Sequence, residues 1–388
     1  MKQTRIIVLG CGMVGATIAR DLAADAELDV AVADVNPQNL ARLAAVCRCR
    51  FVEADLGRPA EVGRLAREHD VAVGALPSHL GLSALKAVIE AGKPYADISF
   101  MAEDAMDLDA LAKERGVTAV VDCGVAPGLA NVCIGYVASL EDRLDDVAFY
   151  VGGLPRRRSW PYQYKAPFAP SDVLEEYTRP VRLVENGQVL IKPALSEPEL
   201  MDFPQVGTLE AFNTDGLRSL IRTIPARNMK EKTLRYPGHI DLMRALRETG
   251  FFSKKEVEVG GVMVRPLDLT AKLLFPKWTL APGEQEFTIL RVVVEGTTGG
   301  RRHRHVFELY DETDQATGQT SMARTTGFPC AVVTRMLAGG EIGQKGVLPP
   351  ELLGRQPGFY GRLINELAAR GVNLTHRREE VETSPAAV

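Results

Sequence analysis

Short apolar runs alternate with segments of helical spacing along the first third of the chain. Residues 6–9 form an uncharged apolar run, which turns through Gly10 and Gly12 into a segment of helical spacing that begins near Met13. A run of this kind is typical of a buried parallel strand. A second apolar run follows at residues 30–33. The chain is therefore predicted to open with a strand, a helix and a second strand.

The same alternation continues to residue 122. Further strands are expected at 50–55, 71–76, 95–98 and 118–122, and helices at 37–46, 59–68, 81–91 and 108–115. Strands that alternate with helices form parallel sheets with right-handed crossovers. The pattern predicts an α/β fold, a Rossmann-type doubly wound parallel sheet.

After residue 122 the pattern changes to longer, less apolar strands joined by hairpins. After a helix predicted at 127–139, turn signals occur at Asn186-Gly187, Gly260-Gly261 and Gly299-Gly300. A strand at 320–326 could extend the last hairpin, and a helical pattern resumes at 331–337. We therefore expect a second, α+β domain with a mixed or antiparallel sheet, spanning 126–324. Residues 1–125 and 325–388 are expected to form the first domain, on the Rossmann-type sheet, although the charged tail from residue 377 should fray.

Composition narrows the class of protein. The chain has 388 residues, 46% of them apolar and 25% charged, with a formal net charge of −4. An acidic balance argues against nucleic acid as a partner, and no apolar run approaches the roughly 18 residues of a membrane span. The N-terminus leads directly into a core strand without a signal peptide, so a cytoplasmic location is expected. Cys47-Arg-Cys49 is expected at a surface helix end and the other four of the six cysteines as small buried thiols, with neither a metal site nor a disulfide framework.

The first turn carries a dinucleotide fingerprint. Gly10 permits a tight turn, Gly12 allows the backbone to approach a pyrophosphate, and Gly15 allows close helix packing. The second strand ends in Asp34, whose carboxylate could hold both ribose hydroxyls and would repel a 2′-phosphate. NAD is therefore expected rather than NADP, since Val35 and Asn36 offer no cation. The predicted cofactor-binding residues are Gly10, Gly12, Met13, Val14, Gly15, Asp34, Val35, Asp55, Leu56, Leu76, Pro77 and Ser78.

Candidates for the chemistry come from strand ends of the first domain and loops of the second. Asp122 ends the last strand of the dinucleotide sheet, where it could act as a general base, anchor an ammonium group or cap the next helix. The long loop 154–170 contains Arg157, Tyr162 and Tyr164, which suit either a small charged substrate or a subunit contact. His239 is expected at a helix start.

Two further groups of polar residues occur in the second domain. Asn213 and Thr214 follow a predicted strand end and could present polar groups to a substrate, or cap a helix. His303 and His305 lie in an arginine-rich strand that is expected to be solvated.

Several segments together resemble the saccharopine dehydrogenase-type oxidoreductases, and among them the L-lysine 6-dehydrogenases. The matching segments are Gly10-Cys-Gly-Met-Val-Gly15, Asp122-Cys-Gly-Val-Ala-Pro-Gly128, Tyr150-Val-Gly-Gly-Leu-Pro155, Leu209-Glu-Ala-Phe-Asn213, Thr233-Leu-Arg-Tyr-Pro-Gly-His239 and Gly346-Val-Leu-Pro-Pro350. The resemblance implies NAD-dependent oxidation of a lysine side-chain amine to a semialdehyde that cyclises. Two alternatives stay open: a saccharopine- or carboxynorspermidine-type imine reductase, and a non-catalytic NAD-binding sensor or assembly protein.

The implied reaction assigns roles to particular residues. Hydride can leave the carbon only when the amine is neutral, and its unperturbed pKa is about 10.4, so a base is required. Asp122 and His239 are the candidates for that base, and an arginine should hold the substrate carboxylate. The predicted substrate-binding residues are Tyr162, Tyr164, Asn213, Thr214, Arg227, Arg235 and Arg157, the arginines being preferred in the order Arg227, Arg235, Arg157. A small amino-acid substrate and a homo-oligomer, such as a homodimer, are expected as partners.

Overall fold

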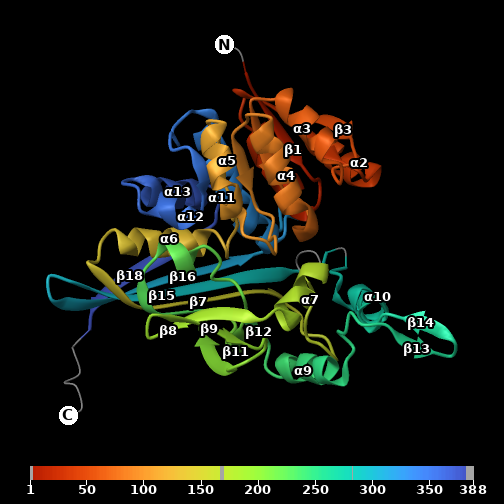
Figure 1. Ribbon diagram of the computed structural model, residues 1–388, viewed down its shortest axis with the longest axis vertical. Coiled ribbons are helices and arrows are strands. Elements are labelled where there is room, and N and C mark those ends of the chain that lie inside the picture. The colour runs from red at the N-terminus through yellow and green to blue at the C-terminus, as the bar shows by residue number, and fades with distance from the viewer. Residues whose placement is uncertain (1–2, 167–169, 282, 382–388) are drawn as a thin grey trace. The chain divides into compact units, whose positions relative to one another are not determined.

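The chain divides into two compact units. The computed structural model describes residues 3–166, 170–281 and 283–381 (Figure 1). The first unit comprises Met1–Ser139 and Ala323–Asn373, and the second comprises Leu140–Met322 and Leu374–Val388.

The first unit is built on a parallel sheet with the strand order β17-β6-β5-β4-β1-β2-β3, seven strands within the described residues. The strands are β1 Thr4–Leu9, β2 Leu28–Asp34, β3 Arg50–Glu53, β4 Val71–Gly74, β5 Tyr95–Asp97, β6 Thr118–Val120 and β17 Gly346–Leu348. The predicted doubly wound α/β sheet is confirmed. Its order reverses at β1, which lies between β4 and β2, and such a reversal is where open α/β sheets bind ligands.

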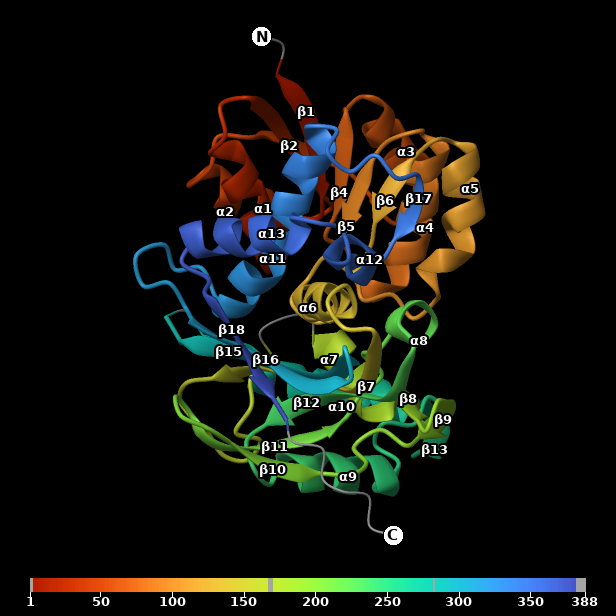
Figure 2. The same ribbon diagram turned by 90° about the vertical axis from the view of Figure 1, so that its left-hand side faces the viewer.

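Helices cover both faces of this sheet (Figure 2). They are α1 Met13–Ala23, α2 Pro37–Ala44, α3 Pro59–Arg67, α4 Ser78–Glu90, η1 Ala105–Leu108, α5 Asp109–Glu114, α6 Leu129–Ala138, α11 Ser321–Ala338, α12 Pro350–Gly354 and α13 Phe359–Ala369. Ile7 and Leu9 of β1 share a buried core with residues of α3, α4 and α5. On the other face, Gly327 of α11 lies against Ile18 of α1.

The second unit is built on a mixed sheet with the order β10-β11-β12-β7-β15-β16-β18, to which β8 and β9 attach through β12. The strands are β7 Arg143–Pro155, β8 Val181–Glu185, β9 Gln188–Lys192, β10 Glu199–Phe203, β11 Gly207–Asn213, β12 Ala226–Arg235, β15 Glu286–Thr298, β16 Arg301–Glu312 and β18 Leu374–Glu380. Strands β12 and β7 run parallel, and the other pairs are antiparallel. The prediction of a second α+β domain is confirmed.

An aromatic core joins this sheet to its helices. The helices are α7 Pro170–Thr178, α8 Leu220–Thr223, α9 His239–Thr249 and α10 Pro266–Trp278. Tyr164, Tyr177, Phe212 and Trp278 belong to one buried cluster with Leu234 of β12. Side chains from α7, α9 and α10 thus share a core with strands that are distant in sequence.

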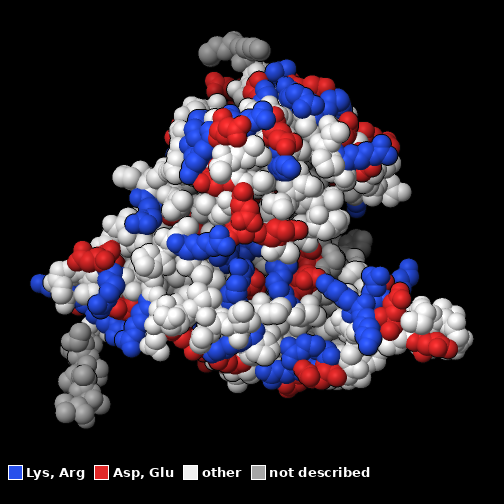
Figure 3. Space-filling view, in the orientation of Figure 1, with Lys and Arg blue, Asp and Glu red and all other residues white. Residues whose placement is uncertain are grey.

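The three predicted hairpin turns are present. Asn186-Gly187 joins β8 to β9, and Gly299-Gly300 joins β15 to β16. Gly260-Gly261 joins β13 (Val257–Val259) to β14 (Val262–Val264). All six turn residues have positive φ, the conformation that such turns need. The hairpin β13–β14 carries exposed Val259, Val262 and Met263. In Figure 3 its tip is largely white, whereas acidic and basic side chains are interspersed over the rest of the face shown.

The strand predicted at 320–326 is wrong, because this segment begins α11. Its threonines favour a strand, but the helix they begin packs against α1 at Gly327, and tertiary packing overrides intrinsic propensity. The compact units also differ from the predicted domain boundaries. Helix α6 belongs to the first unit, and strand β18 belongs to the second.

Two further predictions are wrong for the described residues. The strand that carries His303 and His305 is not simply solvated, and the tail from residue 377 does not fray at its start. His305 is fully buried, and its Nε2 lies 3.0 Å from one oxygen of buried Glu141; Nδ1 of His303 lies 3.0 Å from the other. Arg378 of β18 donates to the same carboxylate. Because β18 pairs with β16, a charged segment that resembles a free tail becomes an ordered strand. Residues 382–388 lie outside the described part of the chain.

Among the described residues, no helix is both long and apolar enough to cross a membrane.

Candidate functional site

Glycines shape the loop between β1 and α1. Gly10 has a φ of +105°, and a Cβ there would lie 2.3 Å from the carbonyl oxygen of Ala75. A Cβ on Gly15 would lie 2.1 Å from the Gly10 carbonyl oxygen, so α1 can approach the loop only with glycine at that position. At Gly12, by contrast, no atom lies within 4 Å of an added Cβ. The loop is therefore tightly packed on one side and open at Gly12.

Helix α1 directs its first turn toward this open side. Gly12 is its N-cap and has no side chain to accept from the first N–H groups, and the first turn carries no acidic residue. Met13, at its start, is half exposed. An N-terminus of this kind is suited to an anion, because N–H groups and the positive end of the helix dipole face outward.

Asp34 ties the end of β2 to this loop. One of its carboxylate oxygens accepts a 2.6 Å hydrogen bond from the Cys11 amide, and the other accepts a 2.7 Å bond from the Asn36 amide. The side chain is largely buried, but each carboxylate oxygen can accept more than one bond. Val35, next in sequence, is 64% exposed. Asp34 could therefore accept ribose hydroxyls while it holds the loop.

The other predicted cofactor residues also follow parallel strands of this sheet. Asp55, beyond β3, forms an ion pair with Arg58 and accepts from the Gly57 amide. Leu56 and Leu76 are buried. Pro77 and Ser78 form the start of α4, beyond β4. These residues occupy the carboxyl ends of β3 and β4, which is the edge that carries the glycine loop.

Two buried carboxylates lie at the ends of neighbouring strands β5 and β6. Asp122 follows β6 and has a φ of +54°, a conformation that is strained for a residue with a side chain. Asp97 ends β5 and is fully buried. Its Oδ1 accepts bonds from the amide and hydroxyl of Ser99, whereas its Oδ2 has no hydrogen-bond partner within the described chain. Sequence reasoning selected Asp122 and missed Asp97, although both end strands at the same edge.

The surroundings of Asp97 raise its pKa to about 7. Burial is the largest cause, and the charge of Asp122 adds to it, while the Ser99 and Tyr95 hydrogen bonds act in the opposite direction. A carboxyl group with this pKa can both accept and release a proton near neutral pH. Perturbed carboxyl groups of this kind are typical of functional sites.

In the second unit, Arg235 is buried at the end of β12 and is bound by its own chain. It forms a 2.6 Å ion pair with Glu176, and its guanidinium lies 4.3 Å from the centre of the Tyr164 ring. Its Nε donates to the Tyr177 hydroxyl, and its Nη1 donates to the Leu234 carbonyl. Burial raises the pKa of Glu176 despite its ion pair with Arg235. These contacts favour a structural role for Arg235 over binding of a substrate carboxylate.

His239 belongs to the same cluster. Its Nδ1 lies 2.8 Å from the Tyr162 carbonyl oxygen, and its Nε2 lies 2.9 Å from the Tyr177 hydroxyl. Burial, reinforced by the charge of Arg235, lowers the pKa of His239 to about 3. The ring is therefore neutral, with Nδ1–H donating to the carbonyl and Nε2 accepting from the tyrosine. Both nitrogens are occupied, so His239 is poorly suited to remove a proton from an amine.

Four predicted residues, Tyr162, Tyr164, Arg235 and His239, are thus brought together, whereas Asn213 and Thr214 bond to other partners. Asn213 donates to Ser196 and Glu197. The hydroxyl of buried Thr214 donates to Glu231, whose pKa burial raises to about 8. Each side chain bonds within its own unit.

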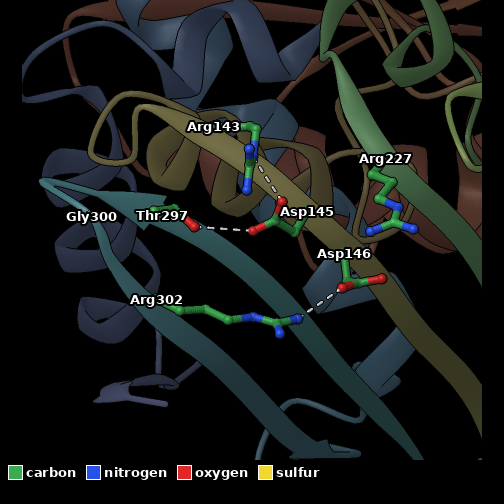
Figure 4. A pocket seen from close by; sticks show the side chains of 7 residues that line it. All are labelled: Arg143, Asp145, Asp146, Arg227, Thr297, Gly300 and Arg302. Atoms are coloured by element: carbon green, nitrogen blue, oxygen red, sulfur yellow. Dashed lines mark hydrogen bonds and ion pairs between the residues drawn. The ribbon is translucent and has the colours of Figure 1, made fainter. Parts of the chain in front are cut away.

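Two of the predicted arginines are widely separated. Arg227 and Arg235 are at opposite ends of β12, roughly 26 Å apart in a strand that rises about 3.3 Å per residue. Arg227 contacts Asn186 and lines a surface pocket of about 350 Å³ (Figure 4). The lining residues are Arg143, Asp145, Asp146, Arg227, Thr297, Gly300 and Arg302. Arg157 is exposed in the loop after β7.

Among the described residues, no cluster of three or more His, Cys, Asp or Glu side chains is arranged to hold a metal ion.

Two family models match the chain. The saccharopine dehydrogenase NADP binding domain matches residues 6–120, and the saccharopine dehydrogenase C-terminal domain matches residues 124–372. The first ends just before Asp122, and the second includes the whole aromatic cluster around Arg235.

Several known proteins are similar over most of the chain. The mitochondrial alpha-aminoadipic semialdehyde synthase of Mus musculus is 21% identical over 95% of this chain and 47% of its own length. The saccharopine dehydrogenase [NADP(+), L-glutamate-forming] of Schizosaccharomyces pombe is 23% identical, covering 95% of this chain and 98% of its own. The carboxynorspermidine synthase of Vibrio cholerae is 24% identical over 74% of each chain. The chain spans about half the length of the mouse and bovine synthases.

A solved structure has the same fold. The apo saccharopine dehydrogenase (L-Glu forming) of Saccharomyces cerevisiae superimposes with a TM-score of 0.80 at 17% identity, covering 97% of this chain and 100% of the yeast chain.

Replacement of Arg235 should test whether it is structural. Arg235→Met leaves the carboxylate of Glu176 buried without its partner, which should destabilise the second unit by about 3–5 kcal/mol. Denaturant unfolding followed by the fluorescence of Trp278, which is buried in the same cluster, measures this loss. Arg157→Met, at an exposed position, is the control and should change stability by less than about 0.5 kcal/mol. Wild-type stability of Arg235→Met with a raised substrate KM would instead identify Arg235 as a substrate anchor.

Proposed function

The chain belongs to the saccharopine dehydrogenase family, and from this premise we propose that it oxidises the side-chain amine of L-lysine, or of a related diamino acid, with NAD. It is an NAD(P)-binding oxidoreductase of a family that acts on CH–NH groups of amino acids. Loss of hydride from the carbon next to the amine gives an imine, and hydrolysis gives a semialdehyde. The remaining amine of the product then closes the ring.

The observation that carries this proposal is the pair of buried carboxylates Asp97 and Asp122. Hydride cannot leave while the substrate nitrogen is an ammonium, so a base must first take its proton. We assign this step to Asp122, and we propose that Asp97, whose pKa is about 7, shares the proton. The strained backbone of Asp122 supports this assignment, because such strain is concentrated at functional sites. His239, with both ring nitrogens occupied, is not assigned a role in proton transfer.

The loop from Gly10 to Gly15 fits a dinucleotide. The space above Gly12 could receive a pyrophosphate, and the first-turn N–H groups of α1 could bind it. Asp34 could accept the ribose hydroxyls. Bound NAD would supply the hydride acceptor. We propose NAD because the Asp34 carboxylate disfavours a 2′-phosphate, although the family model is named for NADP.

The charges of the second unit support a substrate with few carboxylates. Saccharopine carries several carboxylates and would need several available cations. Here Lys165 pairs with Glu284, Arg182 with Asp215 and Arg235 with Glu176. Of the three predicted arginines, we retain Arg157 as the anchor of a single substrate carboxylate, because Arg235 is bound internally and Arg227 contacts Asn186 at the opposite end of β12.

A second candidate function is reduction of an imine formed from an aldehyde and an amino acid. The carboxynorspermidine synthase and saccharopine dehydrogenases among the relatives favour it. The same carboxylates would then return a proton to the nitrogen instead of removing one.

We also propose that the chain self-associates, which the exposed apolar residues of hairpin β13–β14 support.

Assays in both directions test the proposed function. Wild type should reduce NAD with lysine or another diamino acid more efficiently than it oxidises NADH with an aldehyde plus an amino acid. Because Asp97 is ionised only above pH about 7, kcat/KM should fall as the pH drops through that value.

Asp122→Asn should lower kcat/KM about a hundredfold or more, whereas Asp107→Asn, at an exposed position, should leave it unchanged. Retained activity in Asp122→Asn would exclude this base, and turnover only with aldehyde plus amino acid would favour the second function. NAD binding without turnover would indicate a sensor.

Cofactor choice tests the role of Asp34 separately. Wild type should bind NAD more tightly than NADP. Asp34→Asn removes the charge but keeps an acceptor, so the Kd for NAD should rise about tenfold to a hundredfold while the preference over NADP shrinks. Titration calorimetry measures both constants without turnover. Tighter binding of NADP by wild type, or an unchanged preference in Asp34→Asn, would refute the assignment.

A further inference from the structure

Two cysteines face each other in the turn between α2 and β3. The Sγ atoms of Cys47 and Cys49 are 3.0 Å apart, and both residues are partly exposed. The other four cysteines are buried. The turn begins where the Cys47 amide donates a 2.9 Å bond to the Leu43 carbonyl. The sequence predicted a surface helix end here, and the structure adds that the two thiols are in contact.

The environment distinguishes the two sulfurs. Either sulfur can donate in the contact between the two thiols; this contact, with the positive charge of Arg20, lowers the pKa of Cys47 to about 7 despite partial burial. The same hydrogen bond raises the pKa of Cys49. Cys47 is therefore the sulfur that is partly thiolate at neutral pH, and thiolates are the attacking species in disulfide exchange. Cys49 is placed beside it as a resolving thiol.

We propose that Cys47 and Cys49 are a redox-active dithiol that closes reversibly to a disulfide by exchange with a small disulfide such as oxidised glutathione. A disulfide bond is about 2.05 Å long, so the sulfurs must approach by only about 1 Å. Cys47, Arg48 and Cys49 lie between α2 and β3 and belong to neither. Closure therefore need not break a helix or a sheet ladder.

The exchange balances with the small disulfide as the oxidant. The Cys47 thiolate attacks one sulfur of the small disulfide, its S–S bond breaks, and one small thiolate leaves. Cys49 then loses its proton and attacks the Cys47 sulfur, so that a second small thiolate leaves. The two leaving thiolates take up the two protons that the cysteines release. The pair is oxidised by two electrons, and the small disulfide is reduced to two thiols.

The cysteine pair follows α2, the helix that begins shortly after Asp34. The thiol of Cys11, in the glycine loop, donates a 3.6 Å hydrogen bond to the Asn39 carbonyl of α2, and Cys47 follows the end of the same helix. The inference rests on the thiols alone and goes beyond the proposed function. Its test is chemical and does not depend on turnover.

Peptide mapping of the full chain tests the proposal. The chain is equilibrated with mixtures of reduced and oxidised glutathione, quenched with acid and N-ethylmaleimide, and digested with trypsin. Cleavage after Arg42, Arg48 and Arg50 separates the two cysteines into peptides 43–48 and 49–50. Oxidation should leave these peptides joined, or retain 43–50 with two fewer hydrogens, and dithiothreitol should reverse this. The proposal is overturned if both cysteines stay alkylated under conditions that oxidise the unfolded chain, if only glutathione adducts form, or if either cysteine pairs with Cys11.

Variants separate the roles of the two sulfurs. Cys49→Ser should accumulate a stable glutathione adduct on Cys47, whereas Cys47→Ser should form little adduct on Cys49. Cys49→Ala, which removes the hydrogen-bond partner, should also slow alkylation of Cys47 at pH 7 about tenfold, because the thiolate fraction falls toward that of an ordinary cysteine. Arg20→Gln, the matched control, should slow the exchange but reach the same disulfide. Equal reactivity of the two single variants would contradict the assigned order of attack.

Discussion

The hydrogen bond from the Cys11 amide to the Asp34 carboxylate organises the first unit. It joins the loop after β1 to the end of β2, at the edge where the strand order reverses. Gly10 makes this bond possible, because any side chain there would meet the Ala75 carbonyl and force the loop away. The same carboxylate fixes the loop and is proposed to accept the ribose hydroxyls, so the proposed choice of NAD and the shape of the loop depend on one residue.

Much of the fold could be predicted because local signals agree with tertiary structure. Uncharged runs such as residues 6–9 became central parallel strands, and Gly260-Gly261 formed the predicted turn. The failures have a common physical cause. Ser321 begins a helix, and Leu374–Glu380 forms a strand, because each packs against partners that are distant in sequence. Buried His305, in an arginine-rich strand, likewise owes its environment to Glu141, more than 160 residues away.

The candidate site could be predicted only in part. Strand-end position identified Asp122, and the same criterion applied to β5 would have found Asp97. Sequence could not reveal that Arg235 and His239 use their polar groups inside the second unit, because Glu176 and Tyr177 come from α7, about sixty residues earlier. A polar residue type indicates available chemistry, but burial and bonding partners decide whether a substrate can use it.

In the proposed reaction, hydride leaves the carbon that bears the side-chain amine. Lysine deuterated only at that carbon, incubated with NAD and the enzyme, tests it by mass spectrometry of the reduced cofactor. The reduced cofactor should gain deuterium from this substrate, and none from lysine deuterated only at the α-carbon. Label transferred only from the α-carbon, or no cofactor reduction with any diamino acid, would contradict it.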